Sequence, residues 1–152
     1  MSWWEKIRFV IPGDPRGKQR PRVTRAGHAY TPSETVAYEK LVIRKYWEAA
    51  NKAGGPDGGR IRMTERPVML FVTAYYGIPK NASKVRRKMM VDGELVPTRK
   101  PDLDNVVKIV MDGLNGQAYR DDKQVVNIIA GKKWADEPCV EVIIKVYVDD
   151  RE

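Results

Sequence analysis

Residues 100–116 read KPDLDNVVKIVMDGLNG, and residues 119–126 follow closely as YRDDKQVV. The apolar residues of the first stretch recur at helical spacing, which predicts a short amphipathic helix over residues 105–114. Its apolar face consists of Val106, Val107, Val110, Met111 and Leu114. A short helix of this kind is stable only when its apolar face packs against other elements, so the stretch indicates a packed domain.

The polar side of this helix collects charged side chains. Asp104 is expected to be the N-cap, and Asp104, Lys108 and Asp112 repeat every four residues along one face. Pro101 favours extended backbone in the residue before it. If the extended stretch continues, Asp102 and Asp104 point to the same side. Asp102, Asp104 and Lys108 can then face one small volume.

The chain as a whole is strongly basic, which makes this collection of acids unusual. It has 152 residues, with 28 Lys and Arg against 20 Asp and Glu, a net charge of +8 and an isoelectric point near 9.6. Such a charge predicts a polyanionic partner, most often a nucleic acid and sometimes an anionic membrane surface. A basic surface that serves only solubility is the simpler alternative.

The scarcity of cysteine and histidine excludes several kinds of site. Cys139 is the one cysteine, so an intrachain disulfide and a four-cysteine zinc site are excluded, and we expect a small buried hydrophobic residue there. The one histidine, His28, lies in a polar stretch and is a weak basis for nucleophilic catalysis. No signal peptide and no apolar run of roughly 20 residues is present. We therefore expect a location in the reducing bacterial cytoplasm and no contact with a membrane.

Periodicity along the rest of the chain predicts four strands and two more helices. Strands are expected at residues 5–11, 68–76, 124–134 and 140–148, and helices at residues 31–54 and 82–93. Residues 13–30 and 51–60 are expected to form a loop and a flexible connector, because Gly, Pro and polar residues are frequent there. The order β-α-β-α-α-β-β predicts an α+β (mixed α/β) fold, with a mixed sheet packed against helices in one domain over residues 1–152.

The helix over residues 31–54 has an unusually wide apolar arc. Thr31 is expected as its N-cap, with Glu34 completing a capping box. One apolar stripe consists of Tyr38, Leu41, Val42, Tyr46 and Ala49, and a second consists of Val36, Ile43 and Trp47. A dimer contact or a deep core position explains such an arc, and we favour the core. The strand over residues 68–76 is apolar at both alternating positions, which predicts a central strand covered on both faces.

The clustered aspartates favour a site for a hard divalent cation. Mg²⁺ prefers carboxylate oxygens and keeps several waters, so Asp102, Asp104 and an acid from the Asp-Asp pair are suitable ligands. Such an ion offsets the repulsion between carboxylates and a phosphodiester, polarises a phosphoryl oxygen and activates water. Lys108 is placed to stabilise charge that develops on the phosphate. The structural alternative is that a capping Asp, a helical ion pair and an Asp-Asp turn serve stability alone.

Three stretches of the chain resemble a known family. KPDLDNVVKIVMDGLNG and YRDDKQVV closely resemble the signature of the RusA family of Holliday junction resolvases, and PRGKQRPRVTRAGHAYTP resembles the form common in phages and prophages. The resemblance runs over about residues 7–148. It implies a small homodimeric α/β endonuclease that makes paired nicks to resolve four-way DNA junctions in recombination and repair. It also implies Mg²⁺ as the cofactor, with Mn²⁺ as a substitute, and no organic cofactor.

The resemblance also assigns residues. The family's essential acids, which are catalytic and ligate the metal, match Asp102, Asp104 and Asp122, and its essential lysine matches the catalytic Lys108. Asp112 and Asp121 occupy acidic positions of the motif, but the resemblance does not give either a defined role.

Two basic segments are the expected DNA-contacting surfaces. They contribute Arg16, Lys18, Arg20, Arg22, Arg25, Lys84, Arg86, Arg87 and Lys88. Such contacts are made mainly with phosphates, so they give affinity and salt dependence more than sequence readout. Three alternatives stay open: a relaxed Mg²⁺-dependent nuclease acting on forks, flaps or RNA, a non-catalytic nucleic-acid-binding module, and a sugar-nucleotide transferase that uses the DLD motif for its metal.

Overall fold

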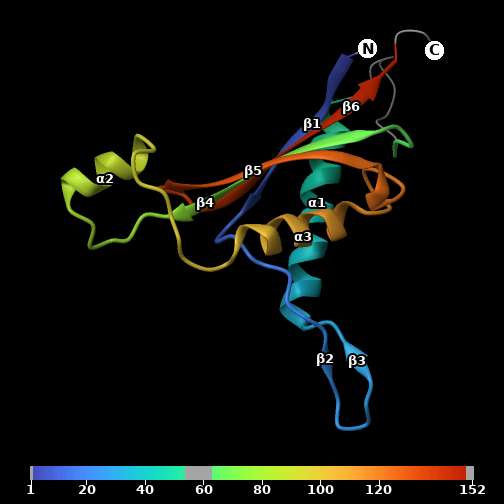
Figure 1. The fold of residues 1–152 in the computed structure, drawn as a ribbon, viewed down its shortest axis with the longest axis horizontal. Coiled ribbons are helices and arrows are strands. Elements are labelled where there is room, and N and C mark those ends of the chain that lie inside the picture. The colour runs from blue at the N-terminus through green and yellow to red at the C-terminus, as the bar shows by residue number, and fades with distance from the viewer. Residues whose placement is uncertain (1, 54–62, 150–152) are drawn as a thin grey trace.

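The computed structural model describes residues 2–53 and 63–149 and shows a four-stranded mixed sheet with helices packed on one face (Figure 1). The strands, in the order β1-β6-β4-β5, are β1 (Ser2–Pro12), β6 (Cys139–Val148), β4 (Val68–Gly77) and β5 (Val125–Ala135). β5 runs parallel to β4, whereas β6 is antiparallel to both β4 and β1. The four predicted strands and the mixed α+β fold are confirmed.

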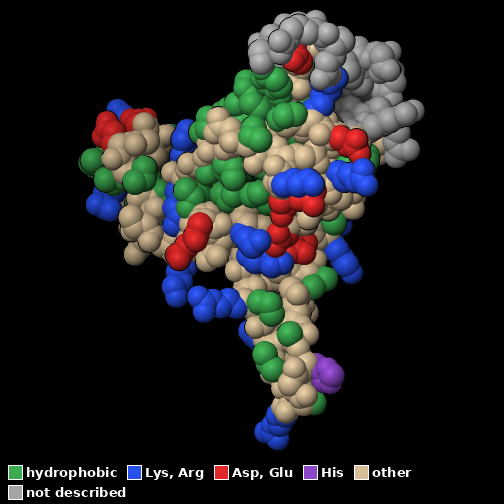
Figure 2. Space-filling view, turned by 45° about the vertical axis from the view of Figure 1, so that its right-hand side comes forward, with side chains coloured by type: hydrophobic (Ala, Val, Ile, Leu, Met, Phe, Trp, Pro, Cys, Tyr) green, Lys and Arg blue, Asp and Glu red, His purple; other side chains and the backbone are tan. Residues whose placement is uncertain are grey.

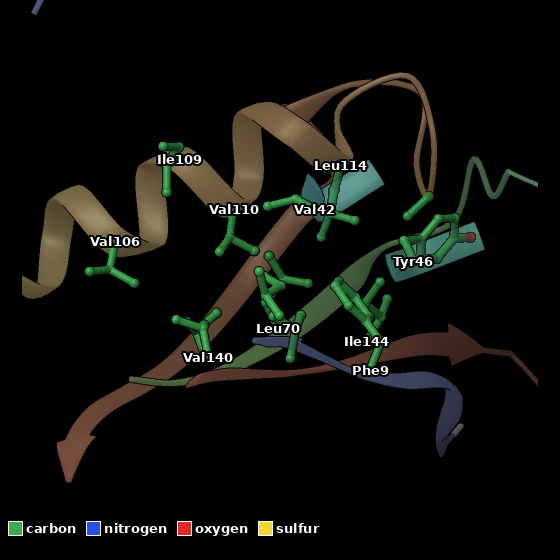
Figure 3. Packing of buried hydrophobic residues seen from close by; sticks show 14 of the residues in the cluster. Phe9, Val42, Tyr46, Leu70, Val106, Ile109, Val110, Leu114, Val140 and Ile144 are labelled. Atoms are coloured by element: carbon green, nitrogen blue, oxygen red, sulfur yellow. The ribbon is translucent and has the colours of Figure 1, made fainter. Parts of the chain in front are cut away.

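Helices α1 (Ser33–Ala53) and α3 (Leu103–Leu114) close the core over one face of the sheet. Figure 3 shows the inward side chains of α3 above those of the strands, with Val42 and Tyr46 of α1 beside them. The two helices approach each other closely because residue 113 is glycine. A Cβ atom at Gly113 would come within 3.0 Å of Val42 Cγ1 on α1. This contact fixes the position of α3, which carries the acidic motif.

The opposite face of the sheet is not covered by a helix within the described residues. Phe71, Thr73 and Tyr75 of β4 are half-buried on this face, while Val10 of β1 and Ile129 of β5 are exposed. The prediction that the strand over residues 68–76 is covered on both faces is therefore wrong. Its second set of apolar side chains is shielded partly by the neighbouring strands and lies on an open face.

A β-hairpin projects from the body of the molecule (Figures 1 and 2). It pairs β2 (Arg22–Val23) with β3 (Ala29–Tyr30), within residues predicted to be a loop. Residues 19–31 are all exposed, so the described structure provides no core that would hold the hairpin. Figure 2 shows basic side chains near its base and at its tip.

The predicted second helix is confirmed as α2 (Lys84–Val91), which extends beyond one end of the sheet (Figure 1). The Ser83 side chain caps it by accepting a hydrogen bond from the Arg86 backbone N–H at 3.2 Å. Because α2 contacts mainly β5, most of its surface is free for another molecule. None of the helices in the described ranges is long and apolar enough to cross a membrane.

The long helix differs from its prediction in three details. It begins at Ser33, so Thr31 lies outside the N-cap position and the expected capping box does not line up. Its first stripe points into the core as favoured, but Val36 of the second stripe is exposed. The helix continues to Ala53, so residues 51–53 of the expected connector are helical, and residues 54–60 lie outside the described residues. Cys139 is half-buried instead of buried.

Candidate active site

The start of α3 positions two of the expected metal ligands. The helix begins at Leu103, so Asp102 is the N-cap residue, and Asp104 lies in the first turn. Asp102 has extended backbone geometry and its side chain makes no capping hydrogen bond. The expectation that Asp104 caps the helix is wrong, as is the extended geometry that would align it with Asp102. Both carboxylates are exposed and free of a capping role.

Tyr76 ties the segment before α3 to the sheet. Its hydroxyl donates a hydrogen bond to the Pro101 carbonyl oxygen at 2.5 Å, next to the Asp102 carboxylate on the chain. The peptide bond between Lys100 and Pro101 is cis. Since Tyr76 is buried in the core at the end of β4, Asp102 is held at a defined place relative to the sheet.

The predicted charged face of α3 is formed. Lys108 Nζ lies 3.4 Å from Asp112 Oδ1, one helical turn further along, as the spacing of the two residues predicts. The Lys108 side chain is 61% exposed, so its ammonium group can also reach a phosphate in solvent. Asp112 is only 21% exposed and has a second cation beside it.

That second cation is Lys18, which was expected to contact DNA. Lys18 Nζ lies 2.5 Å from Glu39 Oε1 on α1 and 3.0 Å from Asp112 Oδ2 on α3. Burial lowers the pKa of Lys18, but its hydrogen bonds and ion pairs with these two carboxylates outweigh burial and raise the pKa above its ordinary value. Lys18 is therefore an internal cation that joins the basic loop to both helices, and it differs from the exposed arginines around it.

Asp122 lies near the same charged group, close enough for Asp112 and Lys108 to affect its pKa. It begins a short 3-10 helix, η1 (Asp122–Gln124), and its Oδ1 atom is buried without a hydrogen-bond partner. Burial and the nearby Asp112 carboxylate raise the pKa of Asp122, while Lys108 opposes this effect. The Tyr119 hydroxyl lies close by and donates to the Met111 carbonyl oxygen at 3.0 Å.

Asp121 has a structural role. Its Oδ1 accepts a hydrogen bond from the Lys123 N–H at 3.0 Å, and its own N–H donates to Gln124 Oε1 at 2.9 Å. These two bonds cap η1. The structural alternative for the Asp-Asp pair therefore holds for its first member, while Asp122 keeps an unpartnered oxygen.

The described residues bring Lys18, Lys108, Asp112 and Asp122 together, with Asp102 and Asp104 nearer the start of α3. Neither Asp102 nor Asp104 is among the charges that shift the pKa of Asp122. No group of three or more His, Cys, Asp or Glu residues suited to a metal ion occurs in the parts of the chain that the structure describes. The donors are nevertheless all oxygens, and Mg²⁺ is often held by only one or two carboxylates together with substrate phosphate. The unpartnered Asp122 Oδ1 fits such an ion.

Comparison with known proteins shows to which family the chain belongs. The family model described as Endodeoxyribonuclease RusA matches residues 12–145. The chain belongs to the RusA endodeoxyribonuclease family. A protein of Bacillus subtilis (strain 168), described as "Uncharacterized protein YqaN", is 34% identical over 144 residues, which cover 91% of this chain and 95% of that protein. The RusA match confirms the family resemblance seen in the sequence and supports a nuclease activity on DNA.

The expected DNA-contacting side chains of this RusA family member fall into three groups. Four arginines in and around the hairpin are exposed: Arg16, Arg20, Arg22 and Arg25. On α2, three cations are exposed, namely Lys84, Arg86 and Lys88, whereas Arg87 forms an ion pair with Asp136 at 2.7 Å. Lys18 is paired inside the site.

Sequence reasoning missed Glu39 and Tyr119. Glu39 comes directly after Tyr38, a residue of the apolar stripe of α1. An acid at the border of a buried stripe could have indicated an internal ion pair. Tyr119 opens the YRDD motif and is fully buried next to Asp122. Its position two residues before Asp121 could have indicated that it supports the acids.

Proposed function

We propose that this protein is a Mg²⁺-dependent, structure-specific endonuclease that resolves four-way DNA junctions in recombination and repair in the bacterial cytoplasm. The observation that carries this proposal is the acidic centre at α3 and η1, set in a strongly basic chain of the RusA family. Acids alone would repel a phosphodiester, so their concentration here makes sense with a bound divalent cation.

The proposal gives each acid a role. Asp102, Asp104 and Asp122 would hold Mg²⁺, or Mn²⁺ in its place, because their side chains are not used to cap helices and Asp122 Oδ1 has no partner. When bound, the ion would polarise the phosphoryl oxygen and lower the pKa of the attacking water. Asp112 supports the site at a distance, because two lysines already neutralise it.

Lys108 would act on the phosphate directly. Its side chain is the more exposed of the two lysines beside Asp112, and its single ion pair is long at 3.4 Å. The ammonium group can therefore donate to a phosphate oxygen and stabilise the charge that builds there during hydrolysis. Lys18 stays with Glu39 and Asp112 and keeps the acids from repelling each other.

A homodimer is part of the proposal. Four-way junctions have approximate two-fold symmetry, and a closed two-fold dimer presents two equivalent sites to opposed strands. The uncovered face of the sheet is our expected interface with the second copy, because Val10 and Ile129 are exposed there beside half-buried Phe71 and Tyr75. Light scattering should give twice the chain mass, and Ile129→Glu should shift the protein toward the monomer.

A cleavage assay tests the proposed function. Wild-type protein is incubated with a four-way junction, a fork, a flap, a duplex and a single strand, each with and without Mg²⁺. Asp122→Asn is compared with Asp14→Asn, which removes the same charge from an exposed loop outside the site. We expect paired nicks in the junction only with Mg²⁺, strong loss of cleavage in Asp122→Asn with junction binding kept, and little change in Asp14→Asn.

Other outcomes separate the alternatives. Equal cleavage of forks or flaps would support the relaxed nuclease. Binding without cleavage at any Mg²⁺ or Mn²⁺ concentration would support a binding module and contradict the proposal. Near-normal turnover of Asp102→Asn, Asp104→Asn or Asp122→Asn would remove that residue from the metal site.

A further inference from the structure

A pocket of about 530 Å³ opens where the loop of residues 15–19 meets the first turns of α1 and α3. Three residues of its lining are buried: Pro15, Thr35 and Ile109. Exposed polar and charged residues complete it, among them Arg16, Gln19, Glu34, Lys100, Asp102 and Asn105. Its volume lies within the usual range of sites for small organic ligands, roughly 300–1,000 Å³.

The walls of the pocket are held firmly in place. The Lys18 N–H donates a hydrogen bond to the Asn105 carbonyl oxygen at 2.9 Å, which fastens the loop to α3. Residue 17 must be small for this contact, since a Cβ atom at Gly17 would lie only 3.0 Å from the Cβ atoms of Pro101 and Asn105. The Tyr76 hydroxyl holds Pro101, another residue of the lining, by donating to its carbonyl oxygen. The pocket is therefore a built feature of the fold.

One polar group in the lining has no partner. Thr35 is 2% exposed, and its Oγ1 atom makes no hydrogen bond. Buried hydroxyl groups are normally hydrogen-bonded, so this one calls for a partner that the described chain does not supply. The first turns of α1 and α3 also meet here, and their backbone N–H groups have no partners within the helices.

The side chains that line the pocket indicate which kind of ligand it would bind. The Glu34 carboxylate would repel a bare phosphate, but it can accept hydrogen bonds from amino groups. The amides of Gln19 and Asn105 offer both donors and acceptors, which suits the edge of a nucleobase. The apolar side chains of Pro15 and Ile109 in the lining suit the faces of a base, and Arg16 and Lys100 suit the attached phosphate.

We propose that this pocket binds one unpaired nucleotide of branched DNA, directly beside the phosphate that is cleaved. The inference rests on the proposed nuclease function and deepens it. Asp102 both lines the pocket and belongs to the expected metal site, so a nucleotide in the pocket is adjacent to the reacting phosphate. Taking a base out of the stack costs least where pairing is already disrupted, as at a branch point. The pocket would thus favour branched DNA over plain duplex.

Fluorescence of 2-aminopurine tests the proposal. The base analogue is placed at each nucleotide around the mapped nicks of a four-way junction, and wild-type protein is added without divalent ion so that the DNA stays intact. We expect the signal of one nucleotide flanking the nick to rise well above that of the free junction. Thr35→Val and Glu34→Gln should require roughly three- to tenfold more protein for the same rise, the usual effect of losing one hydrogen bond.

Glu48→Gln is the matched control, since Glu48 is another exposed glutamate of α1 and lies outside the pocket. It should leave the signal unchanged, and thermal melting verifies that all three variants fold. If the protein binds and cleaves junctions but the 2-aminopurine fluorescence rises at no position, the proposed nucleotide pocket is wrong and the proposed nuclease function stands. A rise that is the same in wild type and in both pocket variants would also overturn it. Failure of wild type to bind or cleave any branched DNA would overturn both proposals.

Discussion

Replacing Lys18 by methionine should destabilise the protein by about 2 kcal/mol, a value between those of surface and buried ion pairs. Lys18 Nζ contacts Glu39 Oε1 at 2.5 Å and Asp112 Oδ2 at 3.0 Å, and all three side chains are only about one-fifth exposed. Exposed pairs contribute about 0–1 kcal/mol, whereas breaking a fully buried pair costs about 3–5 kcal/mol. Methionine keeps the length of the side chain, so the loss comes mainly from two carboxylates left without their cation.

Equilibrium unfolding in urea at pH 7 measures this effect, and the melting temperature should fall by about 4–8 °C. The sign of the pH dependence follows from the raised pKa of Lys18. Its stabilisation is fully present below the unfolded value of 10.5 and is lost as the pH rises through the higher folded pKa. Unfolding at pH 7 therefore measures the whole contribution of the Lys18 ion pairs to the free energy of unfolding.

Lys108→Met is the matched control, because Lys108 pairs with the same Asp112 but is 61% exposed. It should change the free energy of unfolding by no more than about 0.5 kcal/mol. A double variant of Lys18→Met with Asp112→Asn should recover part of the loss, since it removes one of the unpaired charges. If Lys18→Met is as stable as wild type and instead weakens DNA binding, the internal ion pairs contribute nothing and Lys18 is a phosphate contact.

Three further predictions concern the catalytic role of Lys108, the charge of Asp122 and the hairpin. Lys108→Ala should lower the single-turnover rate by about 10²–10³ with little change in junction affinity; a rate within about threefold of wild type would reduce Lys108 to a helix-surface ion pair. Asp122→Asn should stabilise the metal-free protein at pH 7, because burial raises the pKa of Asp122 and its charged form is disfavoured. In urea unfolding, that gain should shrink as the pH falls toward 3.8, and destabilisation at pH 7 would contradict it. Changing Arg20, Arg22 and Arg25 together to glutamine should flatten the slope of log affinity against log salt by about three units. An unchanged slope would remove the hairpin from the DNA surface.

The elements with strong periodicity could be predicted from the sequence. The strand over residues 140–148 alternates apolar and polar positions, and the structure buries Val140, Val142, Ile144 and Val146 as expected. The helix α3 could also be predicted, since the spacing of Val106, Val110 and Leu114 matches a helix and the structure buries all three, although the prediction left out the buried Ile109. In both cases the pattern within one element was enough, because one face packs on the core and the other does not.

Features that depend on contacts between distant segments could not be predicted. The hairpin has only two residue pairs, Arg22 with Tyr30 and Val23 with Ala29, so its sequence carries no alternating pattern to recognise. The sequence also did not indicate that helices cover only one face of β4. A strand between two neighbouring strands can carry apolar residues on both sides without a second layer of helices.

In the candidate site, too, features set by local spacing could be predicted and features set by contacts between distant segments could not. The charged face of α3 followed from helical spacing, and Lys108 meets Asp112 as expected. The internal position of Lys18 depends on a loop that crosses both helices, and no local pattern distinguishes this lysine from the arginines on either side. The resemblance to the family motif identified Asp122 as a site residue. That its Oδ1 atom is buried without a hydrogen-bond partner could be seen only in the structure, where Tyr119 and α3 lie close to it.

The placement of Lys18 and Lys108 explains how a basic protein tolerates a concentration of acids. Asp112 lies between both lysines and is neutralised within the chain, so it needs no external ion. Asp122 borders the same group, yet its buried Oδ1 is left without a partner and its pKa is raised. A carboxylate in that state gains more from an added cation than one that is already paired. Lys18 and Lys108 thus limit repulsion among the acids, and in the proposed nuclease Asp122 is the carboxylate of this group that would accept the metal ion.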